Sequence, residues 1–348
     1  MSFVQTALSR SRALLRVLRR QAVILSYHRI AEADVDPWDL VVRPDRFAEQ
    51  LEVIRRLGRP LSLRDLLRSM RGGRIPRRSI VVTFDDGYAD NLLQAKPLLE
   101  RCDVPATVFL TAGTLDASQS FWWERLTAIF LTAGRLPVSL EIEIGGNVHR
   151  WTLGRASEYD AEEVLRDRGW RGWHREEPTS RHRIYLDLYR LLQPMRETAR
   201  EPVLAALRSW AGNGSVPEPD AARVLSHREA ALLATGRLIE VGAHTMTHPR
   251  LSALNDAEKA DEIHRSRKTL EEIVSQPVTS FAYPYGQPGD YDEQSVAIVR
   301  RAGFTVACAN VPGPVTRDSN VFELPRFHVS DWNGDVFERN LVSWLNAA

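Results

Sequence analysis

Hydrophobic and polar positions follow two different periods along most of the chain, and the two periods alternate. Short apolar runs rich in β-branched residues predict strands, and apolar residues spaced three or four apart predict helices. Strands that alternate with helices favour an α/β fold in which parallel strands are joined by helical crossovers. The predicted strands fall at residues 22–30, 79–84, 106–111, 237–244, 278–286, 304–310 and 322–330. The predicted helices fall at residues 45–57, 62–71, 90–101, 226–235, 256–274, 291–302 and 334–346, with Asp45 and Ser62 as N-caps of the first two.

The alternation breaks between about residues 117 and 222, which predicts an inserted α+β segment. Residues 120–134 have the spacing of an aromatic-rich helix, and residues 138–153 alternate at period two around Gly145-Gly146-Asn147, which predicts a β-hairpin. Two or three polar helices and a linker at 212–220 follow. Five aromatic residues of the insertion either stack on a sugar or belong to its core: Phe121, Trp122, Trp123, Trp170 and Trp173.

The N-terminal segment, residues 1–20, has the pattern of a basic amphipathic helix. It carries arginines at positions 10, 12, 16, 19 and 20, and no acidic residue precedes Glu32. Its apolar runs are shorter than the ~7–15 residues of a secretory core or the ~20 of a spanning helix. The segment either contacts anionic lipid peripherally or packs on the domain with a solvated basic face. We therefore expect one main domain over residues 21–348, interrupted by the insertion, in the cytoplasm or at the inner membrane surface.

The composition is that of a soluble globular protein and gives no sign of a nucleic-acid partner or a disulfide framework. The 348 residues are 43% hydrophobic and 26% charged, as in a soluble globular protein. The net charge of +1 gives no reason to expect a nucleic-acid partner. The only cysteines, Cys102 and Cys308, lie in separate segments that both appear buried, so we expect no disulfide framework.

Two adjacent aspartates end the predicted strand at 79–84. The sequence "SIVVTFDDGYADN" delivers Asp85 and Asp86 to a strand end, where parallel α/β folds have their active sites, and Gly87 permits a sharp turn. Adjacent carboxylates repel each other, so a bound cation is the expected compensation. The alternative is an ordinary Asp-Asp-Gly turn.

Two histidines follow another predicted strand in "EVGAHTMTHPRL". His244 and His248 are four positions apart and could converge on a metal ion, although such a pair can also be incidental. Two imidazoles and one carboxylate suit hydrolytic Zn²⁺ or another divalent ion that accepts nitrogen and oxygen ligands. The second aspartate would then be free to take a proton from an attacking water.

A third motif, "SFAYPYGQPG", ends the predicted strand at 278–286. A backbone N–H near Tyr285 could donate to an oxyanion; the alternative is a tight loop with a packed tyrosine. The three motifs "TFDDGY", "HTMTH" and "YPYG", in this order, resemble the polysaccharide deacetylase family over roughly residues 22–115 and 225–332. The resemblance implies a distorted (β/α)7 barrel and metal-dependent removal of acetyl groups from glycans.

The resemblance also implies roles for individual residues. Asp85 matches the general base, Asp86, His244 and His248 match the metal ligands, and Tyr285 matches the residue whose N–H supports the oxyanion. Many family members have an arginine three positions before that tyrosine, where this chain has Ala282. We expect Arg326, in "LPRFH", to supply the guanidinium from another strand.

Two histidines are candidates for the general acid that protonates the leaving amine. His328 corresponds to the histidine near the end of the barrel in common members. His28, in "LSYHRI", corresponds to the early histidine of a circularly permuted branch similar to poly-N-acetylglucosamine deacetylases. We favour His28, which leaves His328 to shape the pocket.

The sequence therefore predicts a metal-dependent deacetylase, with zinc the expected ion and an N-acetylated polysaccharide or its lipid-linked precursor the expected substrate. The alternatives are an amidohydrolase acting on a small non-sugar amide and a catalytically inactive glycan-binding protein.

Overall fold

The computed structural model describes residues 20–117, 120–212 and 222–347. The predicted N-terminal helix lies outside these residues. Within them, no helix combines the length and the apolar character needed to cross a bilayer.

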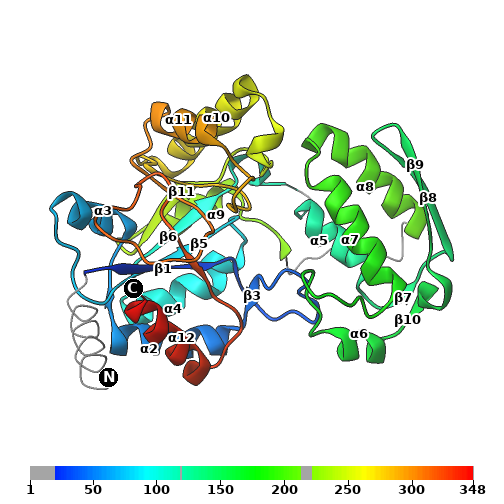
Figure 1. Ribbon diagram of the computed structural model, residues 1–348, viewed down its shortest axis with the longest axis horizontal. Coiled ribbons are helices and arrows are strands. Elements are labelled where there is room, and N and C mark those ends of the chain that lie inside the picture. The colour runs from blue at the N-terminus through cyan, green and yellow to red at the C-terminus, as the bar shows by residue number, and fades with distance from the viewer. Residues whose placement is uncertain (1–19, 118–119, 213–221, 348) are drawn as a thin grey trace, which may run out of the picture.

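A curled sheet of parallel strands forms the centre of the larger part of the molecule (Figure 1). Its order is β13-β12-β11-β6-β5-β1-β14, so the last strand in the chain pairs with the first and the sheet curls toward a barrel. A bridge between Cys308 and Leu324 links the segments at the two ends of this order. The strands are β1 (Ala22–Tyr27), β5 (Ser79–Phe84), β6 (Ala106–Leu110), β11 (Ile239–Ala243), β12 (Ser280–Ala282), β13 (Val306–Cys308) and β14 (Phe327–His328), with β4 (Arg59–Pro60) beside β5. The predicted parallel α/β barrel is confirmed.

Helices pack around this sheet and bury its outer face (Figure 1). Their apolar residues are spaced on one side, so each helix can cover strands while its charged side faces solvent. They are α2 (Pro44–Leu57), α3 (Leu63–Arg71), α4 (Lys96–Cys102), α9 (His227–Leu233), α10 (Asp256–Val274), α11 (Glu293–Arg301) and α12 (Gly334–Asn346). A π-helical turn, Asn91–Ala95, precedes α4, and the short pair β2 (Arg29–Ile30) and β3 (Val41–Val42) follows β1.

The sequence predicted some helix and strand ends correctly and others wrongly. The Ser62 hydroxyl caps α3 by accepting the Asp65 N–H, as predicted. Asp45 is not a cap: α2 starts one residue earlier at Pro44, after Arg43, and Asp45 lies in its first turn. The predicted strand at 322–330 was too long, since only Phe327–His328 pairs with β1.

The insertion folds as a lobe beside the barrel, drawn in green in Figure 1. It contains α5 (Trp122–Phe130), β7 (Gly134–Arg135), β8 (Ser139–Ile144), β9 (Asn147–Thr152), β10 (Glu158–Tyr159), α6 (Ala161–Asp167), α7 (Ser180–Leu192) and α8 (Glu197–Ala211). The predicted hairpin is present, and Gly145 (φ 60°) and Gly146 (φ 81°) form its two-residue turn. The lobe has its own hydrophobic core. Both cysteines are free, as expected.

Candidate active site

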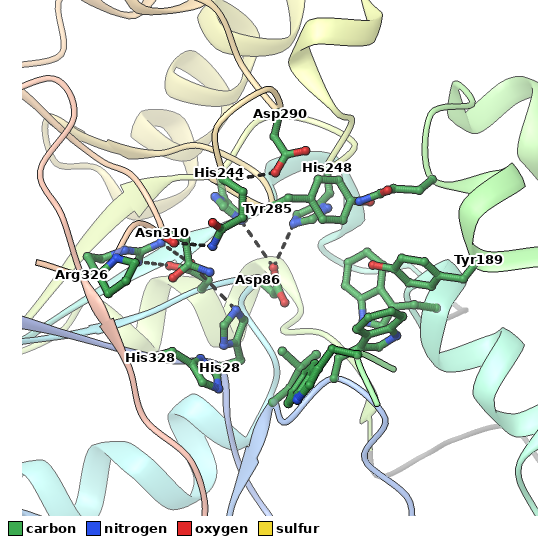
Figure 2. Close-up of a pocket in the computed structure, with 18 of the residues that line it drawn as sticks. His28, Asp86, Tyr189, His244, His248, Tyr285, Asp290, Asn310, Arg326 and His328 are labelled. Carbon is green, nitrogen blue, oxygen red and sulfur yellow. Dashed lines mark hydrogen bonds and ion pairs between the residues drawn. The ribbon is translucent and has the colours of Figure 1, made fainter. Parts of the chain in front are cut away.

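One pocket of about 600 Å³ collects every residue that the sequence singled out for chemistry (Figure 2). It lies at the carboxyl ends of the parallel strands, where the side chains of separate βα units converge. The eight predicted residues in its lining are His28, Asp85, Asp86, His244, His248, Tyr285, Arg326 and His328.

Asp85 and Asp86 leave β5 in different directions because the backbone turns sharply between them. The Asp85 N–H donates to Tyr27 O at 3.0 Å and so continues the pairing of β5 with β1. Asp86 has φ 76°, a left-handed conformation that costs free energy for any residue with a Cβ. The turn separates the carboxylates, so that Asp85 faces Arg326 and Asp86 faces the two histidines.

Asp86, His244 and His248 form a buried cluster whose geometry fits a metal ion. Asp86 Oδ1 lies 3.5 Å from His244 Nε2 and 3.3 Å from His248 Nε2, and one ligand atom from each residue lies within 4.8 Å of the others. His244 Nδ1 lies 2.8 Å from Ala282 O; a carbonyl only accepts, so Nδ1 carries the proton and Nε2 presents its lone pair to Asp86. A lone pair and a carboxylate repel each other, and Asp86 Oδ1 is buried without a hydrogen-bond donor. A cation between these atoms would satisfy all three.

The protonation states favour the same interpretation. Burial lowers the pKa of His244 to about 4 and that of His248 to about 3, so both imidazoles are neutral at pH 7, as metal ligands must be. Burial raises the pKa of Asp86, and a divalent cation in the cluster would oppose this by favouring the ionised carboxylate.

Hydrogen bonds to Glu262, a residue that the sequence analysis did not identify, stabilise the loop that carries His248. Glu262, on α10, accepts the N–H groups of Met246 at 2.8 Å and Thr247 at 2.9 Å, and the Thr247 hydroxyl at 2.8 Å. Thr245 (φ 65°) and His248 (φ 56°) are both left-handed, so the loop is strained and depends on such contacts. In the sequence, Glu262 is one of several acids on a long polar helix.

Arg326 contacts Asp85. Because this chain has Ala282 where many family members have an arginine, we expected Arg326 to supply that guanidinium. Its Nη1 and Nη2 donate to the two Asp85 oxygens, both at 2.7 Å, while its Nε donates to Ala309 O at 2.9 Å. Burial by itself would raise the pKa of Asp85, but the charge and hydrogen bonds of Arg326 outweigh burial and hold it well below its usual range. Asp85 is therefore ionised and fixed in orientation.

The two candidate acids differ in what they face. His28 Nε2 lies 4.0 Å from Asp85 Oδ2, and Asn91 Nδ2 donates to His28 O at 2.8 Å. His328 turns away: its Nε2 lies 2.8 Å from Asp39 O and 3.5 Å from Asp39 Oδ2. Burial lowers the pKa of His28 to about 4, although the carboxylates of Asp86 and Asp85 oppose this. Asn91 and Asp39 were missed because only the fold brings them to these histidines.

Tyr285 stands at the tight turn that follows β12. Its φ is 61°, and its ring packs 4.8 Å from that of His248. In the part of the chain that the structure describes, its N–H donates to no protein acceptor. That N–H is thus available to an oxygen atom in the pocket.

The insertion and the loop after β2 provide an aromatic wall opposite the strand ends. Trp38, Trp123, Trp173 and Tyr189 line it, and Trp38 packs on Tyr189 with ring centroids 4.1 Å apart. Of the five aromatic residues considered for sugar stacking, only Trp123 and Trp173 line the pocket. Phe121, Trp122 and Trp170 are buried in the core of the insertion lobe.

The fold and the donor set define an α/β-barrel protein with a three-ligand candidate metal site at its strand ends. The model of the polysaccharide deacetylase family matches residues 72–132 and 223–307, which carry Asp85, Asp86, His244, His248 and Tyr285 and skip the insertion. Over these residues the chain matches the polysaccharide deacetylase family.

Two curated relatives match short parts of the chain. The protein YxkH of Bacillus subtilis (strain 168) is 27% identical over 92 residues, which are 26% of this chain and 32% of that protein. The poly-β-1,6-N-acetyl-D-glucosamine N-deacetylase of Escherichia coli (strain K12) is 31% identical over 86 residues, which are 24% of this chain and 13% of that protein. The matched segments thus span less than a third of either relative.

Solved structures resemble nearly the whole chain. The Streptococcus pyogenes deacetylase PplD, in complex with acetate, superposes with a TM-score of 0.57 at 16% identity, covering 93% of this chain and 98% of that one. IcaB from Ammonifex degensii superposes with a TM-score of 0.55 at 17% identity, covering 94% and 98%. At this identity the likeness establishes the fold.

Proposed function

We propose that this chain is a metal-dependent deacetylase that hydrolyses N-acetyl groups on the sugars of a polysaccharide or its lipid-linked precursor. One observation carries the proposal: a buried Asp-His-His cluster shares its pocket with a second, ionised aspartate that a buried arginine holds in place. The Escherichia coli relative named for poly-β-1,6-N-acetyl-D-glucosamine makes N-acetylglucosamine polymers the first substrates to test.

Asp86, His244 and His248 would hold the metal ion. We propose zinc because two neutral imidazoles and one carboxylate form a usual three-ligand hydrolytic set for that ion. When bound, the ion would polarise the acetyl carbonyl and lower the pKa of a nearby water molecule.

Asp85 is the proposed general base. Hydrolysis adds a water oxygen to the acetyl carbon and moves a water proton to a base. An ionised carboxylate fixed by the Arg326 fork can accept that proton without first reorienting. The Tyr285 N–H is the proposed donor to the oxyanion that develops on the carbonyl oxygen.

His28 is the proposed general acid. The C–N bond breaks to acetate and a free amine, and the amine nitrogen must gain a proton as it leaves. Burial keeps His28 neutral, so its proton has to arrive during the reaction, and Asp85 lies 4.0 Å away. We propose that the proton taken from water by Asp85 reaches the amine through His28, while His328 remains bound to Asp39 and shapes the pocket.

The test is acetate release by the full chain, loaded with zinc, from β-1,6-linked N-acetylglucosamine oligosaccharides. We expect release that requires metal and falls to background in Asp85→Asn. Release from small N-acetyl amines but not from oligosaccharides would replace the glycan substrate with a small amide. Oligosaccharide binding without acetate release by the zinc-loaded chain would overturn the enzymatic proposal.

A peripheral membrane location and a cytoplasmic compartment remain proposals. They rest on the basic and apolar composition of residues 1–20.

A further inference from the structure

Four arginines line a second cleft, of about 550 Å³, far from the candidate active site. They are Arg20, Arg59, Arg74 and Arg77, and Pro76 completes the lining. All four are exposed, and none forms an ion pair with an acidic side chain that the structure describes. Residues 1–19 contain no acidic residue that could pair with them. Among the residues that the structure describes, the cleft is therefore a concentration of positive charge without an acidic partner.

The cleft forms because three strands begin at the same place. Ser79, the first residue of β5, pairs with Ala22 of β1 and with Arg59 of β4. The Arg59 N–H donates to Arg78 O at 2.7 Å, which holds the start of β4 against the loop before β5. Arginines just before or at these strand starts are thus brought together by the register of the sheet.

The surrounding sequence extends this positive surface. Residues 55–78 contain nine arginines and one acidic residue, Asp65. Residues 1–78 contain seventeen arginines and eight acidic residues, a net charge of +9, so the remaining residues carry −8 to give the total of +1. Like charges in one concave cleft repel, and an anion there would relieve the repulsion. Guanidinium groups match phosphate oxygens in charge and in fork geometry.

We infer that this arginine cleft binds the phosphate groups of an anionic phospholipid surface. The sequence that leads directly into Arg20 favours lipid over a soluble anion. It combines four more arginines with apolar residues such as Leu14, Leu15 and Leu18, a composition that partitions to anionic membrane interfaces. This inference is independent of the reaction at the candidate active site.

The same strands carry the arginines at one end and the candidate catalytic residues at the other. Arg20 precedes β1 and His28 follows it; Arg77 precedes β5 and Asp85 follows it. Each pair is eight positions apart, and at about 3.3 Å per residue of extended chain the two ends lie up to about 26 Å apart. A chain bound to lipid through the cleft therefore opens its pocket away from the surface, toward glycan that extends from the membrane.

The test is co-sedimentation of the full chain with vesicles of phosphatidylglycerol and phosphatidylcholine, compared with phosphatidylcholine alone. We expect binding only to the anionic vesicles, loss of binding at high salt, and at least about tenfold weaker binding for Arg74→Glu/Arg77→Glu. Both residues lie in a loop, so the substitutions spare the helices and strands. Arg168→Glu/Arg183→Glu is the matched control, because these exposed insertion residues line no part of the cleft.

Acetate release from a soluble oligosaccharide separates this inference from the proposed function, since neither pair of substitutions should change it. Equal loss of vesicle binding in both variants, or equal binding to neutral vesicles, would overturn the lipid site. Displacement from the vesicles by millimolar inorganic phosphate, or binding to duplex DNA as tight as to anionic vesicles, would also overturn it, as a general anion site.

Discussion

Two neighbouring carboxylates in one pocket have different surroundings, and the difference assigns their roles. Asp86 faces two imidazole nitrogens, whereas Asp85 faces a guanidinium. Asp86→Ala and His248→Ala should each lose stoichiometric zinc, because either change removes a ligand atom. Asp85→Asn should keep its zinc while acetate release falls about 10²–10⁴-fold, as expected for loss of a general base. Metal analysis and acetate assays on the same preparations check both, and full zinc occupancy in Asp86→Ala would contradict the ligand assignment.

Arg326 contributes both a charge and a fixed fork, and substitutions can separate the two. Arg326→Ala leaves the buried Asp85 without its partner, which should lower the free energy of unfolding by about 3–5 kcal/mol and reduce turnover. Arg326→Lys restores the charge but not the two parallel hydrogen bonds, so it should recover more stability than turnover. Chemical denaturation and acetate release measure the two quantities. Unchanged turnover in Arg326→Ala would show that Arg326 does not orient Asp85.

Left-handed backbone at residues other than glycine marks the same site. Asp86, Thr245, His248 and Tyr285 all have φ between 56° and 76°. Each such residue costs of order 1–3 kcal/mol unless its surroundings hold it in place. These are four of the nine described non-glycine residues with left-handed backbone, and they lie where two candidate ligands and the proposed oxyanion donor point into one pocket.

At the scale of elements, helix α10 supports the ligand loop through a single carboxylate. Glu262→Gln replaces one accepting oxygen with an amide donor, so the 245–248 loop loses accepted hydrogen bonds. Zinc affinity should fall about 10–100-fold, with turnover recovered at saturating zinc. Titration with a zinc chelator measures the affinity. Asp261→Asn, an exposed neighbour on α10, is the control, and equal zinc affinity in Glu262→Gln and the unaltered chain would refute the role.

A buried histidine in the insertion makes the stability of that lobe depend on pH. His182 packs against Trp170 in the first turn of α7, and burial lowers its pKa to about 4, below the usual 6.5. The unfolded chain therefore binds this proton first, and stability present above pH 6.5 is lost as pH falls toward 4, by up to about 3 kcal/mol. Chemical denaturation between pH 7 and 4.5 should show a shallower decline for His182→Gln. Parallel declines would contradict a neutral buried His182.

Sequence patterns predicted the long elements well because periodicity is a local property. The prediction for α10 at 256–274 matches its bounds, and the ordered motifs placed five candidate residues at strand ends. Strand lengths near the sheet ends were overestimated, since pairing and not composition decides where a strand stops. Glu262, Asn91 and Asp39 could not be identified, because each acts on a segment that only the fold brings near. The same holds for the aromatics of the insertion, whose burial depends on how its helices pack.

At the scale of the whole molecule, the barrel supplies the reacting groups and the insertion supplies the opposite wall. The lobe is joined to the barrel by buried polar contacts of Glu124 on α5: Arg29, which also lies 3.2 Å from Asp90, is 3.6 Å from Glu124, and Tyr88 donates to Glu124 at 2.9 Å. Trp123 Nε1 in turn donates to the Tyr88 hydroxyl at 3.0 Å, and its ring packs 4.9 Å from that of His248. The wall is therefore fixed relative to the candidate metal ligands, so it can select substrates by shape.

Trp173 is the part of this wall best placed to contact a second sugar. It lines the pocket, yet 58% of its surface is exposed, which puts its ring at the rim and not beside the reacting group. Loss of one stacking contact of about 1 kcal/mol should raise KM for a tetrasaccharide about fivefold in Trp173→Ala. The turnover number should change little, because the contact is equally present before and during the reaction. A monosaccharide substrate, which does not reach the rim, should show no change in KM.

Leu165→Ala is the matched control, since Leu165 is 52% exposed on the same lobe but lines no part of the pocket. An equal rise in KM for both substrates would place Trp173 at the reacting sugar, and no rise for either would remove it from substrate recognition.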